Sequence, residues 1–137
     1  APFGMESDAH WMLDEVDGVE YGGCCINATL RDYARLGLFA MHNGTLASGQ
    51  QVLPDGWMKE STTSSPGSNI YGYYWWLKPN SSFRATGVFG QFIWIDPKEN
   101  LVVAVHSAWD HAWRDAYYEH TEKLISSISA HLNKIQL

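Results

Sequence analysis

The fold of this chain is decided by the stretch Ala85-Thr86-Gly87-Val88-Phe89-Gly90-Gln91-Phe92-Ile93-Trp94-Ile95-Asp96-Pro97, which leads through a short polar link into Leu101-Val102-Val103-Ala104-Val105. The pattern predicts a β-hairpin, because aromatic and β-branched residues favour strands and Asp96-Pro97 stops the first one. Gly87 and Gly90 fall inside that first strand, where glycine often marks a close approach to the backbone. The second strand is apolar at every position, which favours burial on both faces between helices.

One helix is predicted before this hairpin in the sequence and another after it. Thr29 is a suitable N-cap with Asp32 as a capping-box variant, and the apolar spacing that follows predicts a helix ending at Asn43-Gly44. Arg31 and Asp32 are assigned to capping and solvation of this helix, with no catalytic role. A terminal helix over 114–133 is predicted from one apolar stripe, which consists of Tyr117, Thr121, Leu124, Ile125, Ile128 and Leu132.

Two shorter elements are predicted between the first helix and the hairpin. Pro54 is pre-set for the first turn of a short helix near Trp57. The aromatic run over 71–77 predicts a strand, in which Trp75 and Trp76 must point to opposite sides. Either one of them faces a cleft or both are buried against a helix. The whole pattern predicts an α+β fold, with an antiparallel sheet covered by helices.

Composition excludes several classes of partner. The chain has 137 residues, 45% of them hydrophobic, which suits a folded domain. Its formal net charge of -6 leaves no basic surface for nucleic acid or an anionic membrane. No apolar run approaches the roughly 20 residues of a membrane span. We therefore expect a soluble chain, in either cytoplasm or periplasm, that binds neither nucleic acid nor membrane.

The cysteines and histidines give no indication of a metal or of another cofactor. Cys24 and Cys25 are adjacent, so a disulfide between them would be strained, and they are predicted to pack as small apolar side chains. The spacing of His106, Asp110 and His111 matches no strong metal signature. No cofactor is expected.

Three passages resemble one enzyme family. Ala85-Thr86-Gly87 is similar to the Lys-Thr-Gly strand of the penicillin-recognising serine hydrolases. The continuation Gly-x-x-Gly-Gln, hydrophobic residues and Asp-Pro, the Thr-Leu-Arg-Asp-Tyr-Ala-Arg-Leu-Gly passage over 29–37, and Leu-Pro-x-x-Trp over 53–57 resemble the class C β-lactamase-related branch of esterases and 6-aminohexanoate-dimer hydrolases. The resemblance implies that residues 1–137 are the C-terminal portion of a single β-lactamase/transpeptidase-like domain, incomplete without its N-terminal strands.

The same resemblance implies roles for individual residues. The backbone N–H of Val88 would donate to the oxyanion hole. Ala85 stands where the family has a lysine that helps to hold a β-lactam carboxylate, so β-lactam turnover is not expected. Contact with the substrate is implied for Ala85, Thr86, Gly87, Phe89, Trp75 and Trp76.

The nucleophile of such an enzyme is missing from these residues. A hydrolase of this kind needs Ser-x-x-Lys and a base such as Tyr-x-Asn, and neither pattern occurs. In the family both lie upstream of the passages quoted above, so the chain alone is expected to be inactive. A triad of Ser107, Asp110 and His111 is disfavoured, because no Gly-x-Ser-x-Gly elbow presents the serine.

The sequence thus predicts part of a serine hydrolase that cleaves a small ester or amide through an acyl-enzyme. A β-lactamase-fold protein that binds without catalysis and an unrelated α+β module remain alternatives. The strand over 101–105 is expected to leave an open sheet edge. The missing N-terminal segment or a second copy of the chain would pair with it.

Overall fold

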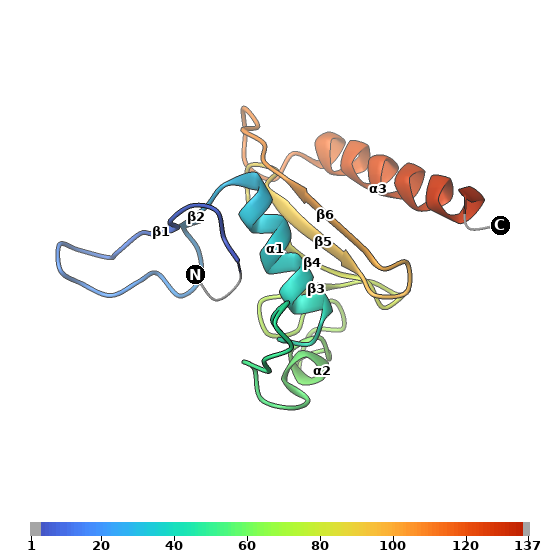
Figure 1. Ribbon diagram of the computed structural model, residues 1–137. Helices are drawn as coiled ribbons and strands as arrows, with labels where there is room; N and C mark the ends of the chain where they lie inside the picture. The colour runs from blue at the N-terminus through green and yellow to red at the C-terminus, as the bar shows by residue number, and fades with distance from the viewer. Residues whose placement is uncertain (1–3, 136–137) are drawn as a thin grey trace.

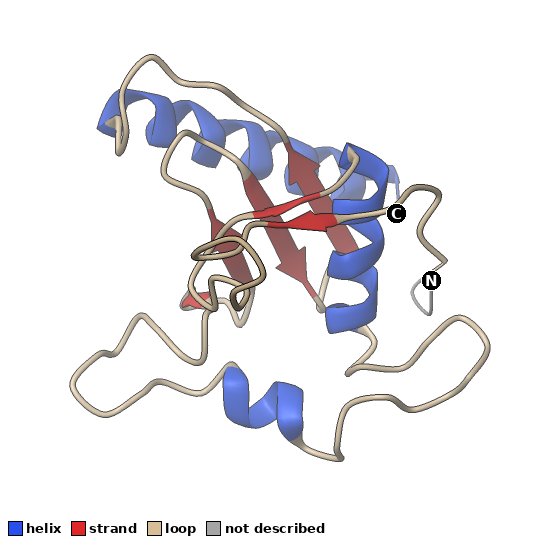
Figure 2. Cartoon of the chain, turned by 90° about the vertical axis from the view of Figure 1, so that its left-hand side faces the viewer, coloured by secondary structure: helices blue, strands red, loops and turns tan. Residues whose placement is uncertain are grey.

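A four-stranded antiparallel sheet forms the centre of the computed structural model, which describes residues 4–135. The strand order is β3 (Trp76–Leu77), β4 (Phe83–Thr86), β5 (Phe92–Asp96) and β6 (Leu101–Val105). Helix α1 (Leu30–Met41) covers one face and α3 (Asp115–Ile135) the other, as Figures 1 and 2 show. The predicted α+β fold with an antiparallel sheet between helices is confirmed.

Alternation along β5 divides the core into two layers. Ile93 and Ile95 pack toward α1, where the core also contains Ala40. Phe92 and Trp94 point to the opposite face and pack with Ile125 of α3. All five residues of β5 are buried, whereas the five residues of β6 are only half-buried. The prediction of burial on both faces therefore describes β5 better than β6, because β6 lies at an edge of this sheet.

Helix α1 begins where the capping pattern predicted. The Thr29 side chain accepts a hydrogen bond from the Asp32 N–H at 3.3 Å, which satisfies one of the free donors of the first turn. The helix then packs closely on the sheet at Gly37, because a Cβ there would lie 2.6 Å from Val102 Cγ1. The predicted end of this helix at Asn43-Gly44 is also confirmed, with both residues at positive φ.

Helix α3 begins one residue after its predicted start and extends two residues beyond its predicted end. Two ion pairs fasten it to the sheet, from Glu122 to Lys78 at 2.8 Å and to Arg84 at 2.6 Å. Ile125 of the predicted apolar stripe is buried, but Leu124 remains 48% exposed. No helix in the described part of the chain is long and apolar enough to cross a membrane.

The remaining elements are short. Helix α2 (Trp57–Ser61) starts three residues after Pro54, so Pro54 precedes the first turn instead of lying in it. The strand predicted over 71–77 is limited to the two residues of β3. Residues 4–28 form an arm that extends away from the sheet (Figure 1), in which β1 (His10–Trp11) pairs with β2 (Ile26–Asn27).

Candidate active site

A cleft of about 840 Å³ lies where β4 ends, between the β4–β5 turn and the base of the N-terminal arm. The turn contributes Thr86, Gly87, Val88 and Phe89, and the arm contributes residues 23–28. A smaller hollow of about 210 Å³ shares part of this lining and adds Ala85. The quoted Ala85-Thr86-Gly87 motif thus borders a cavity at one end of the sheet.

The glycines of the motif lie in a turn and not inside a strand, which corrects the sequence interpretation. The Gly87 N–H donates to the Gln91 carbonyl at 2.7 Å, and the Gly90 N–H donates to the Gly87 carbonyl at 3.2 Å. Gly90 has φ of 87°, a conformation that favours glycine. The Trp109 ring occupies the space that a Cβ of Gly90 would need. The close approach expected at a glycine is therefore made by this indole.

The backbone of the turn is anchored through its carbonyl groups. The Val88 carbonyl accepts from the Trp113 N–H at 2.9 Å, and the Phe89 carbonyl accepts from the Trp109 N–H at 3.1 Å. The Val88 N–H itself has no acceptor among residues 4–135. Val88 lines the cleft and is 38% exposed. A fixed N–H without an internal partner can donate to a negatively charged oxygen in the cleft.

Thr86 supplies a second polar group without a partner. Its Oγ1 is buried, and no hydrogen bond reaches it within the described residues. Buried hydroxyl groups are nearly always paired in folded proteins, so an orphan of this kind requires an explanation. Thr86 lines both the cleft and the smaller hollow. A ligand or another polypeptide segment in the cleft would supply the missing hydrogen bond.

The structure separates the two tryptophans that the sequence left undecided. Trp76 lines the cleft and packs edge-to-face on Tyr71, with ring centroids 4.8 Å apart. Trp75 packs on the core residue Phe83 at 5.0 Å, within the cluster beneath α1. Trp75 does not line the cleft, so its prediction as a substrate contact is corrected. Alternation along the chain turned one ring toward the cleft and the other toward the core.

Four rings of the cleft were not among the site residues predicted from the sequence, namely those of Tyr33, Tyr71, His106 and Trp113. His106 follows β6 and packs edge-to-face on Tyr33, with centroids 5.0 Å apart. The Tyr33 hydroxyl donates to the Ile26 carbonyl, and burial raises the pKa of this phenol above its usual range. The sequence placed Tyr33 only within the helix that follows Thr29. No spacing rule joins Tyr33 to His106, which directly follows the second strand of the hairpin.

Cys24 and Cys25 form a disulfide on the arm side of the cleft, which corrects their prediction as separate apolar side chains. Cys25 has φ of 80°, a conformation that is rare outside glycine. Surrounding donors hold both carbonyl groups. Trp11 Nε1 donates to Cys24 at 2.9 Å, and the Met12 N–H donates to Cys25 at 3.1 Å. The arm therefore fixes the backbone on which the disulfide is built.

The serine triad that the sequence disfavoured is not assembled. The Ser107 carbonyl accepts from Gln91 Nε2 at 2.8 Å. Asp110 pairs with Arg114 at 2.8 Å and with His111 at 3.3 Å on an exposed surface. Within residues 4–135, no group of three His, Cys, Asp or Glu side chains is arranged as metal ligands are.

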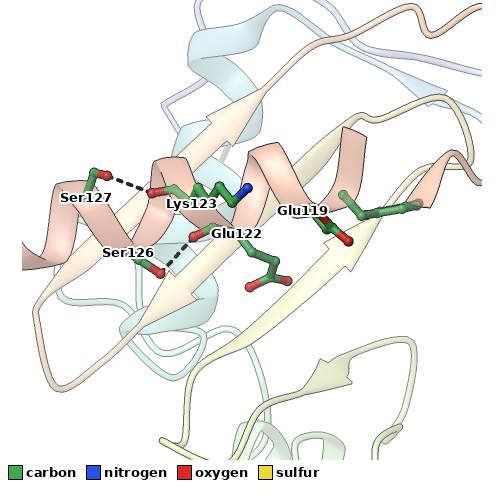
Figure 3. Close-up of a pocket in the computed structure, with 6 residues that line it drawn as sticks. Glu119, Glu122, Lys123, Ser126 and Ser127 are labelled. Atoms are coloured by element: carbon green, nitrogen blue, oxygen red, sulfur yellow. Dashed lines mark hydrogen bonds between the residues drawn. The ribbon is translucent and has the colours of Figure 1, made fainter. Parts of the chain in front are cut away.

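A second depression, of about 590 Å³, lies on the surface of α3 (Figure 3). All of its lining residues come from this one helix. The Ser126 and Ser127 hydroxyls donate at 2.8 Å to the carbonyls of Glu122 and Lys123 on the preceding turn. The Glu122 carboxylate is occupied by its two ion pairs with the sheet. These polar groups are satisfied locally, so the cleft at the end of β4 is the better candidate site.

Comparison with known proteins identifies the sequence relationship. The family model described as Beta-lactamase matches residues 2–125. A search of curated proteins found no match. Among solved structures, the chain is similar to a protein from Bacillus anthracis that carries the name 6-aminohexanoate-dimer hydrolase, with 30% sequence identity and a TM-score of 0.79. The similarity covers 96% of this chain and 36% of that protein, so the chain spans about a third of its length.

Proposed function

The chain belongs to the β-lactamase family, and from this premise we propose that it forms the C-terminal, oxyanion-binding side of a serine hydrolase that cleaves ester or amide bonds. The unpartnered Val88 N–H in the cleft carries this proposal. Negative charge develops on the carbonyl oxygen when a serine attacks an ester or amide, and a fixed N–H stabilises that charge. The unpaired Thr86 hydroxyl beside it supports the same use of the cleft.

The chemistry divides between two parts of the proposed enzyme. A serine from the part that carries Ser-x-x-Lys adds its oxygen to the substrate carbonyl carbon. The resulting oxyanion accepts a hydrogen bond from Val88, and the alcohol or amine leaves with a proton. Water then hydrolyses the acyl-enzyme and releases the acid. Residues 4–135 contribute the oxyanion donor and the surface that holds the substrate, and the other part contributes the nucleophile and base.

The experiment compares this chain with a parent protein that includes the proposed N-terminal part. The 137-residue chain should not hydrolyse p-nitrophenyl esters above background, and the parent protein should. A fluorophosphonate should label one serine of the parent protein and no serine of this chain. Labelling of this chain in proportion to its esterase activity would refute the division of roles.

A non-catalytic binding protein of the same fold is the second candidate. Ala85 stands where the family has a lysine, and it borders the smaller hollow without any charge. The parent protein would then bind small esters or amides without turnover. Absence of fluorophosphonate labelling in a folded parent protein, together with ligand-induced changes in tryptophan fluorescence, would favour this candidate.

We further propose that the outer edge of β6 pairs with a strand from the N-terminal part or from a second copy. β6 has a neighbour only on its β5 side in the described sheet, so its outer backbone groups lack a strand partner. Such an edge attracts another strand. Sedimentation of the purified chain should show self-association that the N-terminal part suppresses. A monomer that unfolds cooperatively at micromolar concentration would refute this pairing.

A further inference from the structure

The lining of the cleft carries very little charge. No Asp, Glu, Lys or Arg side chain borders it within residues 4–135. The His106 ring packs against Tyr33, and His106 takes part in no ion pair among the described residues. The remaining wall combines aromatic and aliphatic side chains, among them Trp76, Phe89 and Trp113, with glycines, the two cysteines and neutral polar residues. A charged group entering this cleft would lose water without gaining an opposite charge.

The Cys24–Cys25 disulfide forms the wall on the arm side. Both cysteines border the cleft and also the smaller hollow next to Thr86 and Gly87. Bonded sulfur atoms are polarisable and apolar, and they make favourable contacts with alkyl and aromatic groups. Hydrogen bonds from Trp11 and Met12 hold the two carbonyl groups, so this wall has a defined position relative to the arm.

We infer that the Cys24–Cys25 disulfide determines substrate specificity by forming, together with Phe89 and Trp113 of the same cleft, a slot for an uncharged alkyl or aryl group. This inference rests on the proposed function, because it assigns the slot to one side of the scissile ester or amide. The disulfide contacts the substrate by packing alone and takes no part in bond cleavage. A substrate group with an ammonium or carboxylate is excluded from the slot.

Two amides with the same six-carbon chain, one without and one with a terminal ammonium, test the slot by binding alone. Hexanamide is neutral, whereas 6-aminohexanamide carries an ammonium at neutral pH on a chain of the same length. The indole N–H resonances of Trp76 and Trp113 in ¹⁵N-labelled chain report occupancy, because both residues border the cleft. Hexanamide should saturate both shifts with a Kd on the order of 1 mM. The ammonium compound should bind at least about tenfold more weakly.

Removal of the sulfur atoms tests the role of the disulfide. The double substitution Cys24→Ala and Cys25→Ala should weaken hexanamide binding about fivefold. It should also reduce the ratio between the Kd values of 6-aminohexanamide and hexanamide. Ser126→Ala, on the distant surface of α3, is the matched control and should change neither value. If the double variant fails to fold, the wild-type chain reduced by a phosphine serves instead, with the same expected loss.

Several results would overturn the inference. They are absence of saturable binding by hexanamide, equal or tighter binding of 6-aminohexanamide, and unchanged binding after removal or reduction of the disulfide. The proposed function fails separately. If the parent protein binds neutral amides selectively but hydrolyses no ester or amide, the hydrolase proposal falls and the slot stands. If the parent protein hydrolyses neutral and charged amides equally well, the slot inference falls and the hydrolase proposal stands.

Discussion

Asp32 at the start of α1 and Thr86 at the end of β4 both hold polar oxygens away from water, but only those of Asp32 are paired. Asp32 is 1% exposed and accepts from the Glu6 N–H at 2.9 Å, the Thr29 hydroxyl at 2.8 Å and Arg35 at 3.0 Å. Thr86 Oγ1 has no partner among the described residues. A saturated network stabilises the fold, whereas an unsaturated group is available to a ligand.

The comparison also separates two meanings of similarity to an enzyme family. The passage over 29–37 resembles the family closely, yet Asp32 ties α1 to residues 6 and 7 and its carboxylate faces no part of the cleft. The Ala85-Thr86-Gly87 motif departs from the family at its first residue and nevertheless borders the cleft. Within the passage over 29–37, Tyr33 lines the cleft and Asp32 does not, so similarity over a passage does not by itself say which of its residues reach the site.

The largest expected effect is on catalysis, at the unpaired groups of the cleft. Val88→Pro removes the free N–H and should lower kcat of the parent protein by about 10²–10³-fold, on the order of 2.7–4 kcal/mol in the barrier. Val88→Ala keeps the N–H and is the matched control, with kcat close to wild type. Steady-state ester hydrolysis by both folded variants decides the matter. Unchanged kcat in Val88→Pro would rule out the oxyanion role.

In the fully hydrogen-bonded network at the start of α1, Asp32→Asn should lower the free energy of unfolding without changing hexanamide binding. The amide cannot accept from all the donors that face the carboxylate, and Arg35 loses its charged partner. Denaturant unfolding should show a larger loss of free energy than Thr29→Ala does, with amide binding by the folded fraction retained. Loss of binding with unchanged stability would reverse the assignment of Asp32.

Acid should reproduce part of the Asp32→Asn effect. The Glu6 N–H lowers the pKa of Asp32 below its usual range, helped by Thr29, Ser7 and Arg35 against the opposing cost of burial. A carboxyl with a lowered pKa contributes stability that is fully present above its unfolded pKa of about 3.9 and is lost as pH falls through the folded value. The stability gap between wild type and Asp32→Asn should therefore shrink below about pH 4. A constant gap in urea titrations across that range would contradict the network.

Thr29→Ala gives a smaller and purely structural effect. The variant removes the cap that accepts from the Asp32 N–H, and it should cost about 1 kcal/mol of unfolding free energy. Thr29→Ser retains the capping oxygen and serves as the control. Circular dichroism with denaturant measures both. Equal stability of the alanine and serine variants would show that the cap contributes nothing.

Thr86→Val should give the smallest change in stability and the opposite sign. The substitution replaces a buried hydroxyl that lacks a partner with a methyl group, so the unfolding free energy should rise by up to about 1 kcal/mol. The same variant in the parent protein should hydrolyse esters more slowly. A loss of stability comparable to that of Thr29→Ala would mean that the Thr86 hydroxyl is paired after all.

Much of the local structure was predictable because it depends on near neighbours. The capping pair Thr29 and Asp32, the end of α1 at Asn43-Gly44 and the bounds of α3 within two residues follow from short-range spacing. The β4–β5 turn was read as a strand, because its glycines sit between strong strand formers. Only the contact between Gly90 and Trp109, 19 positions later, shows that a turn is needed there.

The sequence by itself determined the family, the antiparallel hairpin and the identity of the residues at the end of β4. The tertiary structure alone decided that Trp76 borders the cleft while Trp75 enters the core, and that Tyr33 meets His106. It also decided that the cysteine pair and Thr86 border the same cavity. The physical reason is the separation along the chain over which each kind of interaction acts. Propensity and capping act between residues a few positions apart, whereas a cleft is formed by packing between segments that the chain separates by dozens of residues.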